Sequence, residues 1–143
     1  MPKIYRVMKR DGDFPRIGPT SNSLDVRISR DIEPDENDLV KPQGKGMSVS
    51  PSMRSIPSIL VPRRLCRDRP DLSKAASGSD NQFVWSMGVG PFVAAKVERG
   101  LNLRPDQPAG AKHGVVEPAE IMHIDSYREA LHATREQWSI DEN

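Results

Sequence analysis

Short segments in which apolar and polar residues alternate are the main feature of this sequence. Ile4, Arg6 and Met8 share one side of the first segment. Tyr5 and Val7 share its other side. Alternation with a period of two is typical of a strand, whose successive side chains point to opposite faces. We therefore predict a strand near the N-terminus, with one arginine among apolar neighbours.

Four further segments have strand character, and glycine or proline stands close to most of them. Aromatic and β-branched residues favour strands, whereas glycine and proline end them. The five segments predicted as strands are residues 3–9, 47–49, 83–87, 101–103 and 115–117. Between them, residues 52–58 are expected to form one helical turn. The acidic stretch 31–38 is expected to be an exposed connector, and residues 68–81 the most mobile loop.

One segment near the C-terminus has the period of a helix. The residues that recur there at helical spacing are Tyr127, Leu131, Thr134 and Trp138. This spacing predicts a helix over residues 126–138, because residues three and four apart lie on one helix face. Asp125 or Ser126 is expected to cap its N-terminus, because short polar side chains accept hydrogen bonds from the first free N–H groups.

Composition limits the size and the complexity of the fold. The 143 residues suit one domain, and the sequence shows no internal repeat. With 13 prolines and 10 glycines the elements must be short, which excludes a long helical architecture. Together with the predicted strands and helix, this indicates a single α+β domain over residues 1–143.

The remaining composition excludes several function classes. The single cysteine, Cys66, rules out an internal disulfide and a cysteine-rich zinc site, and it fits a reducing compartment. No apolar run approaches the ~20 residues of a membrane span, and Met-Pro-Lys-Ile-Tyr-Arg does not resemble a signal peptide, so a cytoplasmic protein is expected. The net charge of +1 gives no general attraction to nucleic acid or anionic membrane.

Two local patterns could carry a function, but each has a simpler interpretation. His113, His123 and His132 lack the three- or four-residue spacing of a metal site, so no metal is expected. A group of arginines could bind phosphates or an acidic partner, or it could lie in a solvated loop paired with Asp68 and Asp71. Its members are Arg54, Arg63, Arg64, Arg67 and Arg69.

Polar residues embedded in the predicted strands are the stronger candidates. These residues are Arg6, Ser48 and Glu117, with His113 just before the last strand. A buried arginine needs an acceptor, because an unpaired guanidinium costs several kcal/mol. Patterning alone leaves open whether Arg6 and Glu117 pair with each other, point to solvent, or line a cleft.

Four segments, taken in order, resemble the small antibacterial effector toxins of type VI secretion that have an ADP-ribosyltransferase-like fold. They are Ile4-Tyr5-Arg6-Val7, then Gly46-Met47-Ser48-Val49, then His113-Gly114-Val115-Val116-Glu117-Pro118-Ala119 through Met122, and last Tyr127-Arg128-Glu129 to Gln137-Trp138. Their order and approximate spacing span most of the chain, although residues 51–110 carry no part of the likeness. The resemblance implies a compact split, bent β-core of short strands with a C-terminal helix.

The resemblance also implies a cleft that binds nicotinamide adenine dinucleotide (NAD). In it Arg6 would hold the ribose or the phosphates, and Ser48 would bind the nicotinamide-side ribose or fix the glutamate. Glu117, or His113 in its place, would stabilise the charge that develops as nicotinamide leaves. Tyr5 and Trp85 could stack on the ligand or belong to the core.

The implied function is an antibacterial toxin that transfers ADP-ribose from NAD to an intracellular acceptor, with an immunity protein that covers the cleft. The main alternative is a non-catalytic protein- or RNA-binding domain that uses the basic segment from Arg54 to Arg69. A transferase-like fold that acts on RNA, for example in removing a 2′-phosphate, is a third possibility. Convergence of Arg6 and Ser48 with Glu117 or His113 in one cleft would favour the enzyme.

Overall fold

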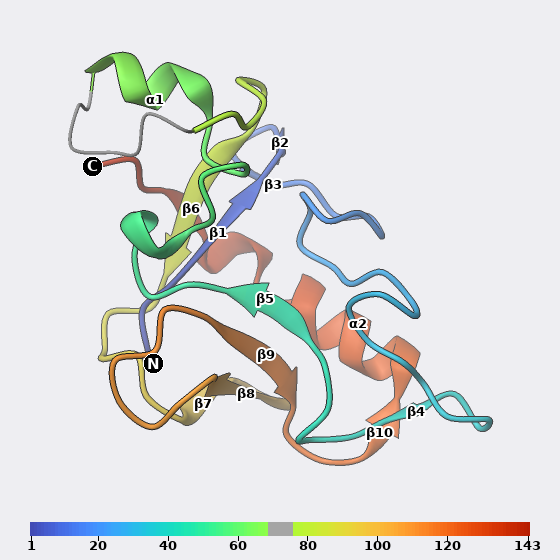
Figure 1. Cartoon of the computed structure of the whole chain (residues 1–143). Helices are drawn as coiled ribbons and strands as arrows, with labels where there is room; N and C mark the ends of the chain where they lie inside the picture. The colour runs from blue at the N-terminus through green and yellow to red at the C-terminus, as the bar shows by residue number, and fades with distance from the viewer. Residues whose placement is uncertain (69–75) are drawn as a thin grey trace.

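The computed structural model describes residues 1–68 and 76–143 and has an α+β architecture of small antiparallel sheets with a C-terminal helix (Figure 1). The strands are β1 (Ile4–Met8), β2 (Arg10–Asp11), β3 (Phe14–Pro15), β4 (Leu39–Val40), β5 (Met47–Val49), β6 (Phe83–Met87), β7 (Ala95–Glu98), β8 (Leu101–Pro105), β9 (Gly114–Pro118), β10 (Met122–His123) and β11 (Ser139–Ile140). The helices are η1 (Met53–Ser55), α1 (Arg63–Asp68), α2 (Ile124–His132) and η2 (Arg135–Gln137). None of the helices in the described ranges is long and apolar enough to cross a membrane.

A three-stranded sheet in the order β1-β6-β11 confirms the predicted strands at residues 3–9 and 83–87. The alternation along β1 separates two cores. Ile4 and Met8 lie in the larger core, whereas Val7 lies in a smaller one with Tyr5 at its margin. Arg6 is on the same side as Ile4 and Met8, so its side chain enters the larger core's margin, where it needs acceptors.

A second sheet has the order β5-β9-β8-β7 and confirms the other three predicted strands. One face carries buried residues such as Met47, Leu103 and Val116. The opposite face is polar, and it carries Ser48 and Glu117. The two sheets meet at a single antiparallel bridge, in which Tyr5 and Ser50 exchange hydrogen bonds of 2.8 and 2.9 Å. Beyond that bridge β1 and β5 are not paired.

The C-terminal helix lies earlier than predicted. It starts at Ile124, because the His123 imidazole accepts a hydrogen bond from the Asp125 N–H at 3.1 Å and thereby caps it. The expected cap at Asp125 or Ser126 is therefore wrong. The α-helix ends at His132, and the 3-10 turn η2 continues towards Trp138. The four residues at helical spacing, Tyr127, Leu131, Thr134 and Trp138, are all buried, although Thr134 and Trp138 lie beyond the end of α2.

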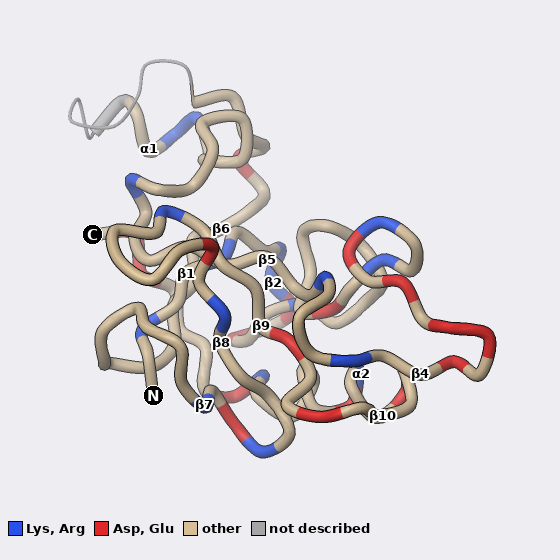
Figure 2. Tube along the Cα trace, turned by 60° about the horizontal axis from the view of Figure 1, so that its bottom comes forward, with Lys and Arg blue, Asp and Glu red and all other residues tan. Residues whose placement is uncertain are grey.

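The segment of the chain between β5 and β6 contains one element that was not predicted from the sequence. The short helix α1 follows directly after Pro62, a position at which proline favours helix initiation. The single turn η1 confirms the helical turn expected within residues 52–58. The acidic connector is mostly exposed, and Figure 2 shows its red segments on the loop that leads into β4. Much of the predicted mobile loop, residues 69–75, lies outside the described residues.

Gly46, at the start of β5, offers a direct test of how tightly the second sheet is packed. A β-carbon there would lie 2.6 Å from the Val116 carbonyl oxygen and 3.2 Å from the Tyr127 hydroxyl. That hydroxyl bridges Val116 and the Met47 N–H, so the clash would disturb both bonds. We expect Gly46→Ala to lower the free energy of unfolding by about 2 kcal/mol, typical of overpacking. Chemical denaturation checks this value, and Gly44→Ala, where the nearest atom is 3.7 Å away, is the control.

Candidate functional site

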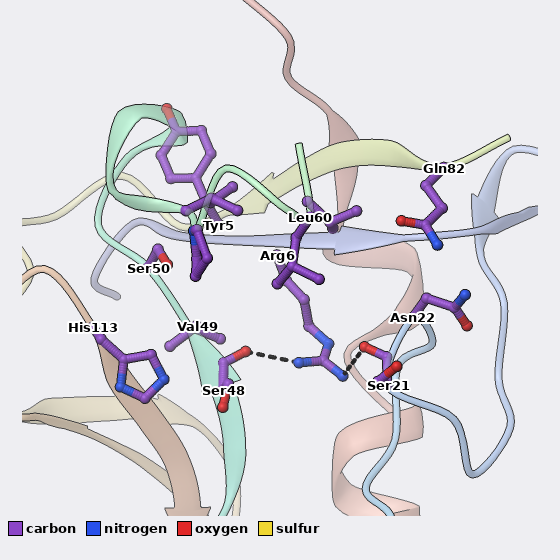
Figure 3. Close-up of a pocket in the computed structure, with 13 residues that line it drawn as sticks. Tyr5, Arg6, Ser21, Asn22, Ser48, Val49, Ser50, Leu60, Gln82 and His113 are labelled. Atoms are coloured by element: carbon purple, nitrogen blue, oxygen red, sulfur yellow. Dashed lines mark hydrogen bonds between the residues drawn. The ribbon is translucent and has the colours of Figure 1, made fainter. Parts of the chain in front are cut away.

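A cleft lies where β1 and β5 diverge beyond the Tyr5–Ser50 bridge, and we call it the β1–β5 cleft. Its volume is about 190 Å³. Arg6 from β1, Ser48 from β5 and His113 from the loop before β9 all line it (Figure 3). Three of the four residues predicted as catalytic are therefore brought together, although they come from distant parts of the sequence.

The Arg6 guanidinium holds the polar wall of the cleft in place. Its Nη1 donates to the Ser48 carbonyl oxygen at 2.8 Å, and its Nε donates to the Ser23 carbonyl oxygen at 3.0 Å. Its Nη2 donates to the carbonyl oxygens of Ser21 and Asp25 at 3.2 and 3.5 Å. Because these bonds use most of the five N–H donors of an arginine, Arg6 joins β1 to β5 and to the loop 21–25.

Burial shapes the electrostatics of this arginine. The residue is 8% exposed, and its burial lowers the pKa of the guanidinium to about 10, despite the opposing effect of Asp31. A pKa of about 10 still leaves the group charged at neutral pH. The carbonyl oxygens provide hydrogen bonds but carry no full negative charge. Arg6 therefore places a charged group in the cleft wall, with the carboxylates of Asp25 and Asp31 near enough to act on its pKa.

The free edge of β1 forms the floor of the cleft at Val7. On this edge Tyr5 exchanges hydrogen bonds with Ser50, and the Lys9 N–H donates to the Asn22 carbonyl oxygen at 2.8 Å. Backbone groups of alternate residues in a strand point to the same edge. The N–H and C=O of Val7, midway between Tyr5 and Lys9, therefore point out of the sheet between these two attachments.

The neighbouring strand supports this direction. Val84 pairs with Val7 in the register of β1 and β6, but its carbonyl oxygen accepts from the Asp141 N–H at 2.8 Å on the far side. Val7 and Val84 are thus a non-hydrogen-bonded pair. Within residues 1–68 and 76–143 no group bonds to the Val7 N–H or C=O, although the residue is only 7% exposed. Backbone groups on a buried strand edge need a hydrogen-bond partner, which water or a ligand that enters the cleft can supply.

His113 supplies an ionisable side chain at the mouth of the cleft. Its Nδ1 lies 2.9 Å from the Asp106 carboxylate, and 41% of the side chain is exposed. A carboxylate at Nδ1 favours the tautomer that leaves Nε2 free to accept a proton. Ser48 contributes its carbonyl oxygen to Arg6, and the residue remains exposed for a ligand.

Glu117 does not line this cleft. Its carboxylate is 6% exposed, and it accepts from the Arg104 Nε at 3.0 Å and from the Gln43 N–H at 2.8 Å. It lines a separate hollow on the polar face of the second sheet, next to Lys96 and Asn102. Pairing of Arg6 with Glu117, one of the alternatives left open by the sequence, does not occur, because Arg6 donates to backbone carbonyl oxygens and Glu117 accepts from Arg104. The residue that lies in one cleft with Arg6 and Ser48 is therefore His113 and not Glu117.

Neither of the two aromatic candidates, Trp85 and Tyr5, is placed to stack on a ligand beside Arg6 and Ser48. Trp85 is fully buried, and its indole N–H donates to the Met8 carbonyl oxygen at 2.9 Å. It is a core residue with no surface for a ligand. Tyr5 lines the cleft, but its ring points away from Arg6 and Ser48 (Figure 3). The Lys3 ammonium lies 5.3 Å from the centre of that ring.

The arginine group between Arg54 and Arg69, proposed for the alternative function, includes at least one residue with a structural role. Arg64 donates to both carboxylate oxygens of Glu142 at 2.9 and 2.8 Å, and it stacks on Phe83 at 4.9 Å. It therefore attaches α1 to the C-terminal segment. Arg63 is exposed, whereas Arg69 lies outside the described residues.

Asp25 fixes the loop that holds Arg6. Burial acts to raise the pKa of this carboxyl, but hydrogen bonds from Arg128, from the Val26 N–H and from His132 outweigh it, so the pKa is lowered. A carboxyl with a lowered pKa stabilises the fold above its unfolded value of about 3.9, and this contribution is lost as pH falls through the folded value. We expect the free energy of unfolding to fall below about pH 4, and less steeply in Asp25→Asn. Urea titrations at several pH values measure both slopes, and equal slopes would contradict the assignment.

In comparisons with known proteins, no family model, no curated protein and no solved structure matches this chain. Among the residues that the structure describes, no group of three or more His, Cys, Asp or Glu side chains is placed to hold a metal ion. The chemistry of the β1–β5 cleft is therefore the basis for a functional proposal.

Proposed function

We propose that the β1–β5 cleft binds the nicotinamide end of NAD and that the protein is an antibacterial ADP-ribosyltransferase toxin. The observation that carries the proposal is the unpaired N–H and C=O of Val7 beside Arg6, Ser48 and His113. Two sheets that are joined by one bridge and diverge beyond it are also what the implied split β-core requires. Because no relative was detected, the proposal rests on the geometry of the cleft and on the resemblance of the four sequence segments.

A primary carboxamide is complementary to the edge of β1 at Val7. Such a group carries one acceptor and two donors. It can accept from the Val7 N–H and donate to the Val7 C=O, as a neighbouring strand would. The volume of about 190 Å³ is below the ~300–1,000 Å³ that encloses drug-sized ligands. The cleft therefore fits the nicotinamide riboside portion, and the remainder of NAD would lie at its mouth.

The polar wall suits the sugar and the phosphates. Arg6 places a positive charge in the wall, and Ser21, Asn22 and Ser48 add groups that can bond to hydroxyls. An arginine binds phosphate or ribose oxygens strongly, because its hydrogen bonds are charge-assisted. Here most of the Arg6 donors are engaged, so we assign it mainly an electrostatic and positioning role.

NAD supplies a ribose whose bond to nicotinamide is activated, because nicotinamide leaves as a neutral molecule. In the proposed reaction the bond between the ribose C1′ and the acceptor forms as the bond to nicotinamide breaks. The acceptor must lose one proton. His113, held by Asp106 at the cleft mouth, can take it, a role that differs from the charge stabilisation expected of Glu117 or His113 from the sequence.

A toxin of this kind needs an inhibitor in the producing cell. We propose a cognate immunity protein that covers the cleft. Leu60 lines the cleft and is 45% exposed, and the adjacent Ile59 is 68% exposed. Exposed apolar residues beside a binding cleft are typical of protein contact surfaces. The acceptor is proposed to be an intracellular macromolecule.

The experiment expresses the protein in bacterial cytoplasm under tight control and follows growth and the transfer of label from NAD. Ser48→Ala and His113→Ala are expected to relieve growth arrest and to reduce labelling while the fold is retained. Glu117→Gln is the matched control, because Glu117 lies outside the cleft. The proposal fails if the parent protein does not arrest growth and transfers no label from NAD to any acceptor. It also fails if Glu117→Gln is the only inactive variant.

A further inference from the structure

A buried carboxylate connects the C-terminal helix to the loop that encloses Arg6. Asp25 is 1% exposed and accepts from Nε and Nη2 of Arg128 at 2.9 and 3.0 Å. His132, one turn further along α2, places its Nε2 2.9 Å from the same carboxylate. A fork of two parallel bonds fixes orientation as well as distance.

The loop attached in this way provides most of the acceptors of Arg6. The carbonyl oxygens of Ser21, Ser23 and Asp25 accept three of the four hydrogen bonds of its guanidinium, and Ser48 accepts the fourth. Displacement of the loop would therefore change the direction in which the guanidinium points. Neither Arg128 nor His132 lines the β1–β5 cleft.

We infer that Arg128 and His132 are positioning residues, which orient the Arg6 guanidinium through Asp25 from outside the cleft. Helix α2 thereby contributes to ligand binding without contact with the ligand. The structural part of this inference stands by itself, whereas its effect on affinity rests on the proposed function.

Arg135 provides a matched control for Arg128. It also joins the C-terminal segment to carbonyl oxygens near the N-terminus, through bonds of 2.9 Å to both Pro15 and Asp11. These carbonyl oxygens do not belong to the loop that holds Arg6. Loss of either arginine is expected to lower stability, but only loss of Arg128 should act on Arg6.

The test follows the Arg6 Nε–H signal in nitrogen-15 NMR spectra, which requires no ligand. We expect Arg128→Ala to shift this signal and to speed its hydrogen exchange about tenfold, the size of one lost charge-assisted hydrogen bond. Arg135→Ala should leave it unchanged. Arg128→Lys keeps the charge without the fork, and an intermediate effect is expected. It also keeps the test valid if Arg128→Ala does not fold.

A second measurement gives the dissociation constant for NAD well below the unfolding temperature. We expect Arg128→Ala to weaken binding about tenfold, whereas Arg135→Ala leaves it unchanged. An Arg6 signal and an affinity that are identical in parent, Arg128→Ala and Arg128→Lys would overturn the inference. If the signal responds but the parent does not bind NAD, the positioning role stands and the proposed function fails.

Discussion

Replacing Val7 by proline is expected to abolish nicotinamide binding while the first sheet remains intact. Proline removes the N–H that points into the cleft and fills the space with its ring. The β1–β6 ladder loses no bond, because the Val7 N–H is on the free edge. Proline is tolerated in strands at such edge positions. Loss of the hydrogen bond from the N–H alone would weaken binding about tenfold, and the proline ring blocks access of the carboxamide to the remaining C=O.

Val7→Ala is the matched control for this change. It keeps the N–H and the C=O and removes apolar contacts with the smaller core, in which Val7 packs with Met53, Ile56 and Val84. Both variants should lose stability, but only Val7→Pro should lose the ligand. Calorimetric titration with nicotinamide, together with circular dichroism of each variant, separates the two effects. Equal affinities in Val7→Pro and the parent would exclude the edge of β1 as the binding site.

Replacing Arg6 by methionine is expected to cause the largest loss of stability among the site residues. Methionine fills much of the volume but leaves the carbonyl oxygens of Ser21, Ser23 and Ser48 without their donor. An unsatisfied buried acceptor costs about 1–3 kcal/mol, so a total loss of about 3 kcal/mol or more is expected. Urea denaturation measures this loss. An inactive Arg6 variant is therefore evidence about catalysis only if its fold is verified.

Arg10→Met is the control for Arg6→Met. Arg10 is the first residue of β2, is exposed, and its side chain donates one hydrogen bond to the Gly12 carbonyl oxygen at 2.9 Å. Its loss should cost less than about 1 kcal/mol, as is usual for surface substitutions. Similar losses in the two variants would show that the four carbonyl contacts of Arg6 contribute little to the fold.

The strands were predictable because each depends on a local pattern. Alternation in residues 3–9 gave β1 and both of its faces correctly. The start of α2 was not predictable in this way, because its cap is the imidazole of His123 and not one of the usual capping residues. Helix α1 was missed, because proline ends helices in most contexts and initiates them only at their first turn.

The candidate site was predictable only in part, since side-chain type does not reveal which edge or face adjoins a cleft. Arg6, Ser48 and His113 were expected in one cleft, and they are. Glu117 shares the sheet face of Ser48, but its carboxylate pairs with Arg104 across the sheet. Val7 was missed, because its contribution comes from backbone groups. Such a site becomes visible only when the partners of each strand edge are known.

The most direct test of a nicotinamide site in the β1–β5 cleft is a nicotinamide titration followed by nitrogen-15 NMR. We expect saturable shifts that centre on the Val7 N–H and the Arg6 Nε–H, with the Gln43 N–H, which is bound to Glu117, unaffected. Titration with benzamide, which keeps the carboxamide, should shift the same signals, whereas pyridine should not. Absence of any saturable shift at Val7, or shifts that centre on Gln43, would contradict a nicotinamide site in the β1–β5 cleft.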